Sequence, residues 1–205
     1  MKRVLLTVLF LILAIAGYYW YKFSKTSSGD SGPKQAPITL KKHSDGFNNA
    51  VTAAMKSYFD MSASFVEADT AMAKEHCRKF IQLMDSIPLD ELKKDTATIY
   101  EVAMNTFSNI KTNAGSLLLQ TDITEMRKDF STVSENLYPS FFQVINYEGD
   151  KMYWQHCPMA FNDDIGANWV SATKEVVNPY LGKNHPKYKS TMLNCGMVKD
   201  TIKAQ

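Results

Sequence analysis

The feature that most restricts the fold is a helical period of apolar residues, which recurs four times between residues 45 and 141. Apolar side chains spaced alternately three and four residues apart lie on one face of an α-helix. The first stripe consists of Phe47, Val51, Ala54, Tyr58, Met61 and Phe65. The second consists of Met72, His76, Phe80, Leu83 and Ile87. The third consists of Ile99, Val102, Phe107, Ile110, Ala114 and Leu117, and the fourth of Ile123, Met126, Phe130, Val133, Leu137 and Phe141. Four such helices joined by short connections predict an all-α fold, an antiparallel helical bundle.

Residues that start and stop helices flank these stripes. Ser44 or Asp45 can cap the first helix, and Asp122 stands at the start of the fourth, where it can accept hydrogen bonds from the first free backbone N–H groups. Pro88 should end the second helix, and Pro139 should kink or end the fourth just before it, because proline cannot donate the backbone bond that a helix interior needs.

The domain is expected to run over residues 43–205, with the bundle at 43–147. The remaining segment, 148–205, has no long helical period, and we expect it to be irregular. Within it, weak alternation at residues 151–156 predicts a short extended segment. Residues 167–177 predict a short helix, and the last residues from Met197 a fraying helix or a tail.

An apolar run from Val4 to Tyr21 follows Lys2 and Arg3 at the N-terminus. As a helix it spans about 27 Å, just enough to cross a bilayer. We therefore predict a transmembrane signal-anchor in the inner membrane at residues 1–22, with the domain in the periplasm. A signal peptide cleaved before Gly17 is the alternative, and it would release the domain into the periplasm. The anchor is favoured because the apolar run continues past that position into aromatic residues.

Residues 23–42 are rich in Ser, Gly, Pro and Lys and have no apolar period, which predicts a flexible linker. The whole chain of 205 residues has a net charge of only +2, and its Lys and Arg are spread rather than collected on one stripe. This excludes nucleic acid as an expected partner.

The stretch from Tyr153 to Val198 concentrates sulfur-containing side chains. It holds two of the three cysteines, and each has a methionine two residues further on, as in Cys157 with Met159 and Cys195 with Met197. Met192 lies three residues before the second cysteine. Thiolate and thioether ligands together suit Cu(I) best.

Four short patterns in this stretch carry a resemblance to a known family. They are Cys157-Pro158-Met159-Ala160; Gly166-Ala167 followed by Trp169 and Ser171; Asn178-Pro179-Tyr180 followed by Gly182; and Met192-Leu193 followed by Cys195-Gly196. The chain from about residue 45 to 202 resembles a bacterial domain of unknown function, found on secreted or membrane-anchored proteins and on membrane-fusion subunits of heavy-metal efflux pumps. The resemblance implies a helical domain ending in a cysteine and methionine segment, copper binding, and metal-efflux components as partners.

The candidate ligands are the two cysteines and the donors that lie near them in sequence. We expect thiolates from Cys157 and Cys195 and thioethers from Met159 and Met192, with His156 and Met197 as further candidates. Such a soft site favours Cu(I) or Ag(I) over ions that prefer oxygen. Zinc is the alternative metal, and it would need two further nitrogen or oxygen donors, including His156.

A disulfide between Cys157 and Cys195 is the competing interpretation, because paired cysteines in an oxidising compartment are normally joined. The protein would then be a non-catalytic interaction module, stapled by that bond, which binds a partner through aromatic residues such as Trp154 and Trp169. Free thiols would favour the metal site, whereas a staple would leave only Cys77 free.

An enzyme is not expected. The chain contains no HExxH motif, no glycine-rich phosphate loop and no paired-carboxylate motif. A cysteine nucleophile would need a positioned base, and no motif supplies one. Cys77 is expected to be a buried apolar residue, His76 a packed histidine, His43 solvated within the linker, and His185 a surface residue.

Overall fold

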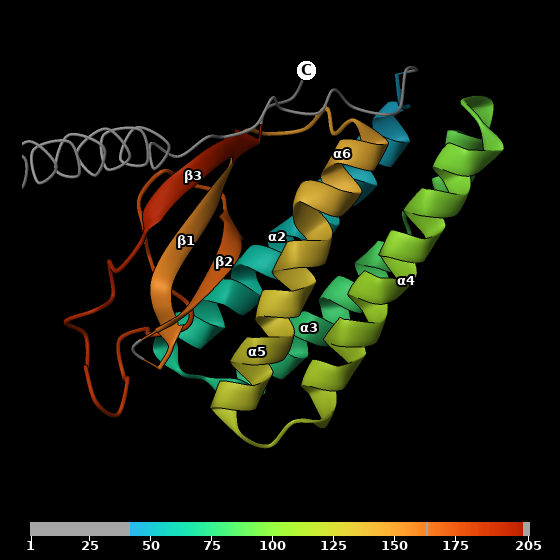
Figure 1. Ribbon diagram of the computed structural model, residues 1–205. Helices are drawn as coiled ribbons and strands as arrows, with labels where there is room; N and C mark the ends of the chain where they lie inside the picture. Colours follow the sequence, from blue (N-terminus) through green and yellow to red (C-terminus); the bar gives the residue numbers. More distant parts are fainter. Residues whose placement is uncertain (1–41, 163, 203–205) are drawn as a thin grey trace, which may run out of the picture. The chain divides into compact units, whose positions relative to one another are not determined.

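The computed structural model describes residues 42–162 and 164–202 (Figure 1). Its helical part consists of α2 (Asp45–Glu67), α3 (Thr70–Asp85), the 3-10 helix η1 (Leu89–Lys94), α4 (Ala97–Leu119), α5 (Ile123–Glu135), the π-helical turn η2 (Asn136–Phe141) and α6 (Phe142–Ile145). Consecutive long helices run in opposite directions. The four helices predicted from the apolar stripes are therefore confirmed.

The helix ends follow the capping signals. The Ser44 side chain accepts a hydrogen bond from the Phe47 backbone N–H at 3.1 Å, and Asp122 accepts bonds from Thr124 and Glu125. At the fourth helix, Tyr138 leaves the helical conformation with φ −135° and ψ 133°, as expected of a residue that precedes proline. The predicted kink at Pro139 is thus confirmed.

The buried face of α3 is offset by one position along the chain from most of the predicted stripe. The helix buries Ala73, Cys77, Phe80 and Met84. Met72, which begins the predicted stripe, is 39% exposed. The Cys77 thiol donates to the Ala114 carbonyl at 3.2 Å, which turns this face toward α4 and confirms Cys77 as a buried residue.

His43 is not solvated as predicted. It is buried, its ring stacks on Phe47 at 4.1 Å between centroids, and its Nε2 contacts the Ile145 carbonyl. The imidazole has an apolar surface large enough to extend the core at the start of α2, so the folded domain begins before the helix does.

A three-stranded antiparallel sheet overturns the all-α prediction. It consists of β1 (Met152–Phe161), β2 (Ile165–Ser171) and β3 (Met197–Ile202), in the order β2-β1-β3. The extended segment expected at residues 151–156 lies within β1, but the helix expected at 167–177 and the helix or tail expected from Met197 are wrong. In β2 the aromatic and β-branched side chains of Trp169 and Val170 suit a strand, and both are buried because both sheet faces are covered.

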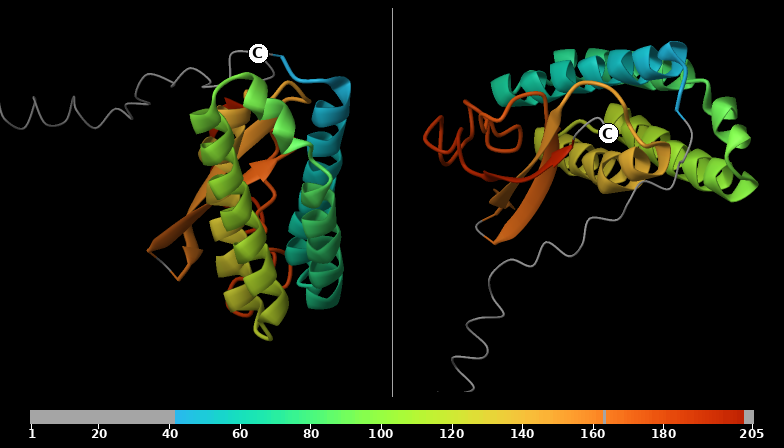
Figure 2. Two further views of the ribbon diagram at one scale, coloured as in Figure 1. Left: turned by 90° about the vertical axis from the view of Figure 1, so that its right-hand side faces the viewer. Right: turned by 90° about the horizontal axis from the view of Figure 1, so that it is seen from above.

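Helices cover one face of this sheet, and an irregular segment covers the other. On one side, the rings of Trp154 and Tyr138 lie 5.3 Å apart, so η2 packs on β1. On the other side, the Gln155 side-chain amide donates to the carbonyls of three consecutive residues, Thr173, Lys174 and Glu175. Figure 2 shows the strands beside the helices, with the segment of residues 172–196 looping outside them.

Within residues 42–162 and 164–202, no helix is both long enough and apolar enough to cross a bilayer. The predicted anchor at residues 1–22, and all but the last residue of the predicted linker at 23–42, lie outside the described residues.

Candidate metal site

The structure brings the two predicted thiol ligands into direct contact. Cys157 lies in β1 and is fully buried, whereas Cys195 lies in the turn before β3 and is partly exposed. Their Sγ atoms are 2.7 Å apart. Two cysteines separated by 38 residues in the sequence therefore lie side by side.

Asn178 holds the turn that carries Cys195. Its side chain is fully buried, and its amide nitrogen donates to the Cys195 carbonyl at 2.8 Å. Its amide oxygen accepts bonds from the backbone N–H groups of Tyr180 and Leu181. The Asn178 backbone N–H also donates to the Leu193 carbonyl. The Asn-Pro-Tyr pattern thus positions Cys195, a role that sequence reasoning missed although asparagine before proline is a turn signal.

Gly196 permits the close approach of this turn to the sheet. Its φ of +141° is rare for residues with side chains, and an added Cβ would lie 2.7 Å from the His156 carbonyl oxygen and 3.1 Å from the Trp169 ring. Any larger residue would push Cys195 away from Cys157.

The environment of Cys195 favours its protonated thiol. Burial raises the pKa of Cys195 to about 12, and the hydrogen bond and charge interaction with Cys157 act in the same direction. At neutral pH Cys195 therefore carries its proton. The two cysteines can bind a metal ion as thiolates, or lose two electrons and two protons to an oxidant and form a disulfide.

His156 of β1 and Met197 of β3 lie on the face of the sheet opposite to Cys157. Neighbouring residues of a strand point to opposite faces, so His156 cannot share an ion with the adjacent cysteine. Its Nδ1 lies 2.8 Å from the side-chain oxygen of Asn168. Met197 stands directly opposite His156 in the β1–β3 register and is 50% exposed. The six predicted ligands are therefore divided between two faces of the sheet.

Met159 and Met192 remain near the irregular segment. Met159 lines a cavity of about 170 Å³ together with Asn162, Leu181, His185, Lys187 and Tyr188. Met192 is half-buried against the core, and its carbonyl accepts the Cys195 backbone N–H at 3.0 Å. Met192 is thus joined to Cys195 through the backbone, whereas Met159 belongs to the cavity that His185 and Tyr188 also line. His185 is half-buried rather than on the surface.

Residues 54–147 match a protein family described as a protein of unknown function (DUF3347). A DUF3347 domain covers this part of the chain. No curated protein and no solved structure matches the chain. The DUF3347 match begins within α2 and ends before β1, so it includes Cys77 but neither Cys157 nor Cys195.

The pair of cysteines has fewer neighbouring ligands than a structural zinc site needs. Among the residues that the structure describes, no three His, Cys, Asp or Glu side chains come together to hold a metal ion. Structural zinc sites use four such ligands. The two cysteine thiolates are soft ligands of the kind that Cu(I) and Zn(II) accept.

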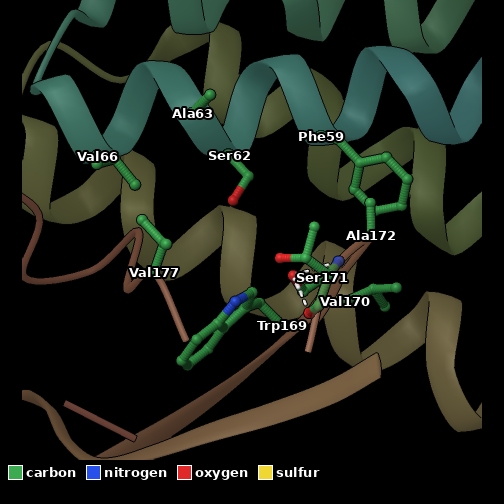
Figure 3. Close-up of a pocket in the computed structure, with 10 residues that line it drawn as sticks. Phe59, Ser62, Ala63, Val66, Trp169, Val170, Ser171, Ala172 and Val177 are labelled. Atoms are coloured by element: carbon green, nitrogen blue, oxygen red, sulfur yellow. Dashed lines mark hydrogen bonds between the residues drawn. The ribbon is translucent and has the colours of Figure 1, made fainter. Parts of the chain in front are cut away.

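A separate groove lies where α2 of the DUF3347 domain faces β2 (Figure 3). Its volume is about 280 Å³, and its walls include Phe59, Val66, Trp169 and Val177. Trp154 and Trp169, the aromatics expected to contact a partner, are only 8% and 1% exposed. They belong to the core instead.

Proposed function

We propose that this protein binds a soft monovalent metal ion, Cu(I) or Ag(I), through Cys157 and Cys195 outside the cytoplasm, as part of metal homeostasis or efflux. The observation that supports this proposal is the contact between two thiols from distant segments, one buried and one partly exposed. A metal ion could reach the pair from the Cys195 side. The protein has no expected catalytic role.

Metal binding requires the two sulfur atoms to separate. With metal–sulfur distances near 2.3 Å, two thiolates on one ion lie roughly 3.7 to 4.6 Å apart. Their separation in the dithiol is 2.7 Å. Cys157 is enclosed by the sheet, whereas the partly exposed Cys195 side chain can change rotamer while Asn178 holds its backbone. A thioether from Met192 or Met159 would complete the coordination.

A second candidate is the stapled interaction module, and the short Sγ–Sγ distance favours it. Oxidation of the pair would close a loop of 38 residues and stabilise the fold by about 4 kcal/mol in the chain-entropy account. That bond would remove both thiolate ligands.

Competition for Cu(I) tests the metal proposal. Under reducing conditions the protein should take about one Cu(I) from a chromogenic chelator, and Cys157→Ser with Cys195→Ser should abolish this. Cys77→Ser is the matched control and should compete as the wild type does, because that thiol is buried on α3. Equal competition by the double serine variant would refute the proposal.

Two further measurements identify the metal and the redox state. Met159→Leu and Met192→Leu should weaken Cu(I) binding and leave any Zn(II) binding nearly unchanged, because a thioether is a ligand for the softer ion. Thiols are then counted in denaturant, in protein purified without reductant. Three thiols favour the metal proposal, whereas one thiol, combined with no Cu(I) binding after reduction, establishes the stapled module.

A further inference from the structure

The two sulfur atoms of the cysteine pair differ in how far solvent reaches them. Cys157 is 0% exposed, whereas Cys195 is partly exposed. Cys157 lies two residues after Gln155 in β1, so the two side chains project from the same face of the sheet. The bonds of Gln155 to the carbonyls of Thr173 and Glu175 show that the irregular segment covers this face. A reagent in solvent therefore meets Cys195 first.

The backbone that carries Cys195 is held by hydrogen bonds that involve neither sulfur atom. The chain from Val176 to Cys195 returns beside its own start. There the Asn178 backbone N–H donates to the Leu193 carbonyl and the Asn178 side chain to the Cys195 carbonyl, both at 2.8 Å. The Asn194 side chain donates to the Val176 carbonyl at 2.7 Å. A change in the redox state of the sulfurs can therefore leave these bonds in place.

Formation of a disulfide needs only a small movement of the two sulfurs. Their separation is 2.7 Å. A disulfide joins its sulfurs at about 2.05 Å, so they must approach by roughly 0.7 Å. Coordination of one metal ion by both thiolates needs the opposite movement, because the two sulfurs must then separate. The bond and the ion thus exclude each other at the same pair of atoms.

We propose that Cys157 and Cys195 form a reversible redox switch, in which a disulfide closes the metal site and exchange with an outside dithiol through Cys195 opens it. In the opening step, a thiolate of the outside dithiol attacks Sγ of Cys195, and Cys157 leaves as a thiolate that takes up a proton. The second outside thiol then displaces Cys195 and completes the outside disulfide. The protein gains two electrons and two protons, and the outside dithiol loses them. Control of metal binding rests on the function proposed above, whereas the route through Cys195 does not.

Mixed disulfides test the route of exchange. The reduced full chain carrying Cys157→Ser, incubated with glutathione disulfide, should gain one glutathione on Cys195, as located by peptide mass mapping. Folded Cys195→Ser should gain none, and its Cys157 should react only in denaturant. The wild type should form the internal disulfide and keep no glutathione, because Cys157 is in contact with Cys195 and displaces the glutathione. Cys77→Ser is the matched control and should behave as the wild type does.

Brief alkylation of the reduced wild type gives the same information without a serine variant. Iodoacetamide should modify Cys195 in the folded protein and leave Cys157 unmodified, because access governs the attack. Modification of Cys157 in the folded protein as fast as that of Cys195 would overturn the proposed route. A wild type that keeps glutathione on Cys195 and forms no internal disulfide would overturn the switch.

Competition for Cu(I), with the copper kept reduced by ascorbate, tests control of the metal site. Wild-type protein oxidised with glutathione disulfide should lose its ability to compete with a chromogenic chelator. Reduction with dithiothreitol, followed by removal of that reagent, should restore it. Equal competition by the oxidised and reduced forms would overturn the switch alone. Failure of the reduced form to compete would instead refute the function proposed above, and the route through Cys195 would stand or fall on the mass mapping.

Discussion

The hydroxyl group of Tyr58 on α2 accepts the backbone N–H of Val170 on β2 at 3.1 Å. The same hydroxyl lies 2.7 Å from Oγ of Ser134 on α5, and Ser134 donates in turn to the Phe130 carbonyl. Along the same edge, the Tyr180 hydroxyl donates to the Asn168 carbonyl. Tyrosines therefore close the outer edge of β2, which prevents another strand from pairing there.

Tyr58→Phe should destabilise the fold by about 1–3 kcal/mol, because it leaves the buried N–H of Val170 without an acceptor. Urea unfolding of the reduced protein measures this loss. Tyr153→Phe is the control, since that residue is half-buried on β1 and the change should stay within about 0.5 kcal/mol. Equal stability of the two variants would contradict the role given to the Tyr58 hydroxyl.

The helices could be predicted because each apolar stripe is local and continuous. The sheet could not be predicted, because the strands that pair are far apart in the sequence and their side chains do not alternate between polar and apolar. The segment that covers one face of β1 and β2 buries Gln155 and Trp169, so polar and apolar side chains do not alternate as in a half-exposed sheet. Pro158 also interrupts β1, where the register with β2 shifts between Cys157 and Phe161.

The candidate site was predictable in composition but not in arrangement. The structure places Cys157 and Cys195 in contact, and their approach depends on Asn178 and Gly196, whose contacts are not visible in a linear pattern. The separation of His156 from Cys157 follows from the alternation of side chains along a strand, because β1 continues through both residues.

Arg127 links the helices to the turn that leads to Cys195. Its buried guanidinium donates to the Phe65 carbonyl at the end of α2 at 2.7 Å and to the Pro179 carbonyl at 2.9 Å. Arg127→Met should cost about 2 kcal/mol, because two carbonyls lose their donor while the desolvated charge is also removed. It should also speed alkylation of Cys195, since the Pro179 turn loosens.

The control for this variant is Arg78→Met, on the exposed side of α3. It should change neither the urea midpoint nor the alkylation rate appreciably. A variant of Arg127 that loses stability but alkylates at the wild-type rate would show that the turn is held without the guanidinium.

Cys77 should make stability fall in alkaline solution. Burial raises the pKa of its thiol from 9.0 to about 12. The folded state thus keeps a proton that the unfolded state loses, so this contribution is fully present below about pH 9 and is lost as pH rises toward 12. Between pH 8 and 10, the wild type should lose about 1 kcal/mol more stability than Cys77→Ala. Urea unfolding at both pH values, under reductant, measures the difference, and parallel losses in the two proteins would refute it.

The same substitution at two glycines should change stability in opposite directions. Gly182 has φ +58°, and an added Cβ would lie 2.6 Å from the Val66 carbonyl oxygen, which already accepts the Lys183 N–H. Gly182→Ala should therefore cost about 1–3 kcal/mol through backbone strain and displacement of the end of α2. Gly115 lies inside α4 with nothing within 4 Å of an added Cβ, so Gly115→Ala should stabilise by about 0.5–1 kcal/mol. Urea unfolding of both variants beside the wild type decides the matter, since a shift of the two midpoints in the same direction would be incompatible with this packing around the end of α2.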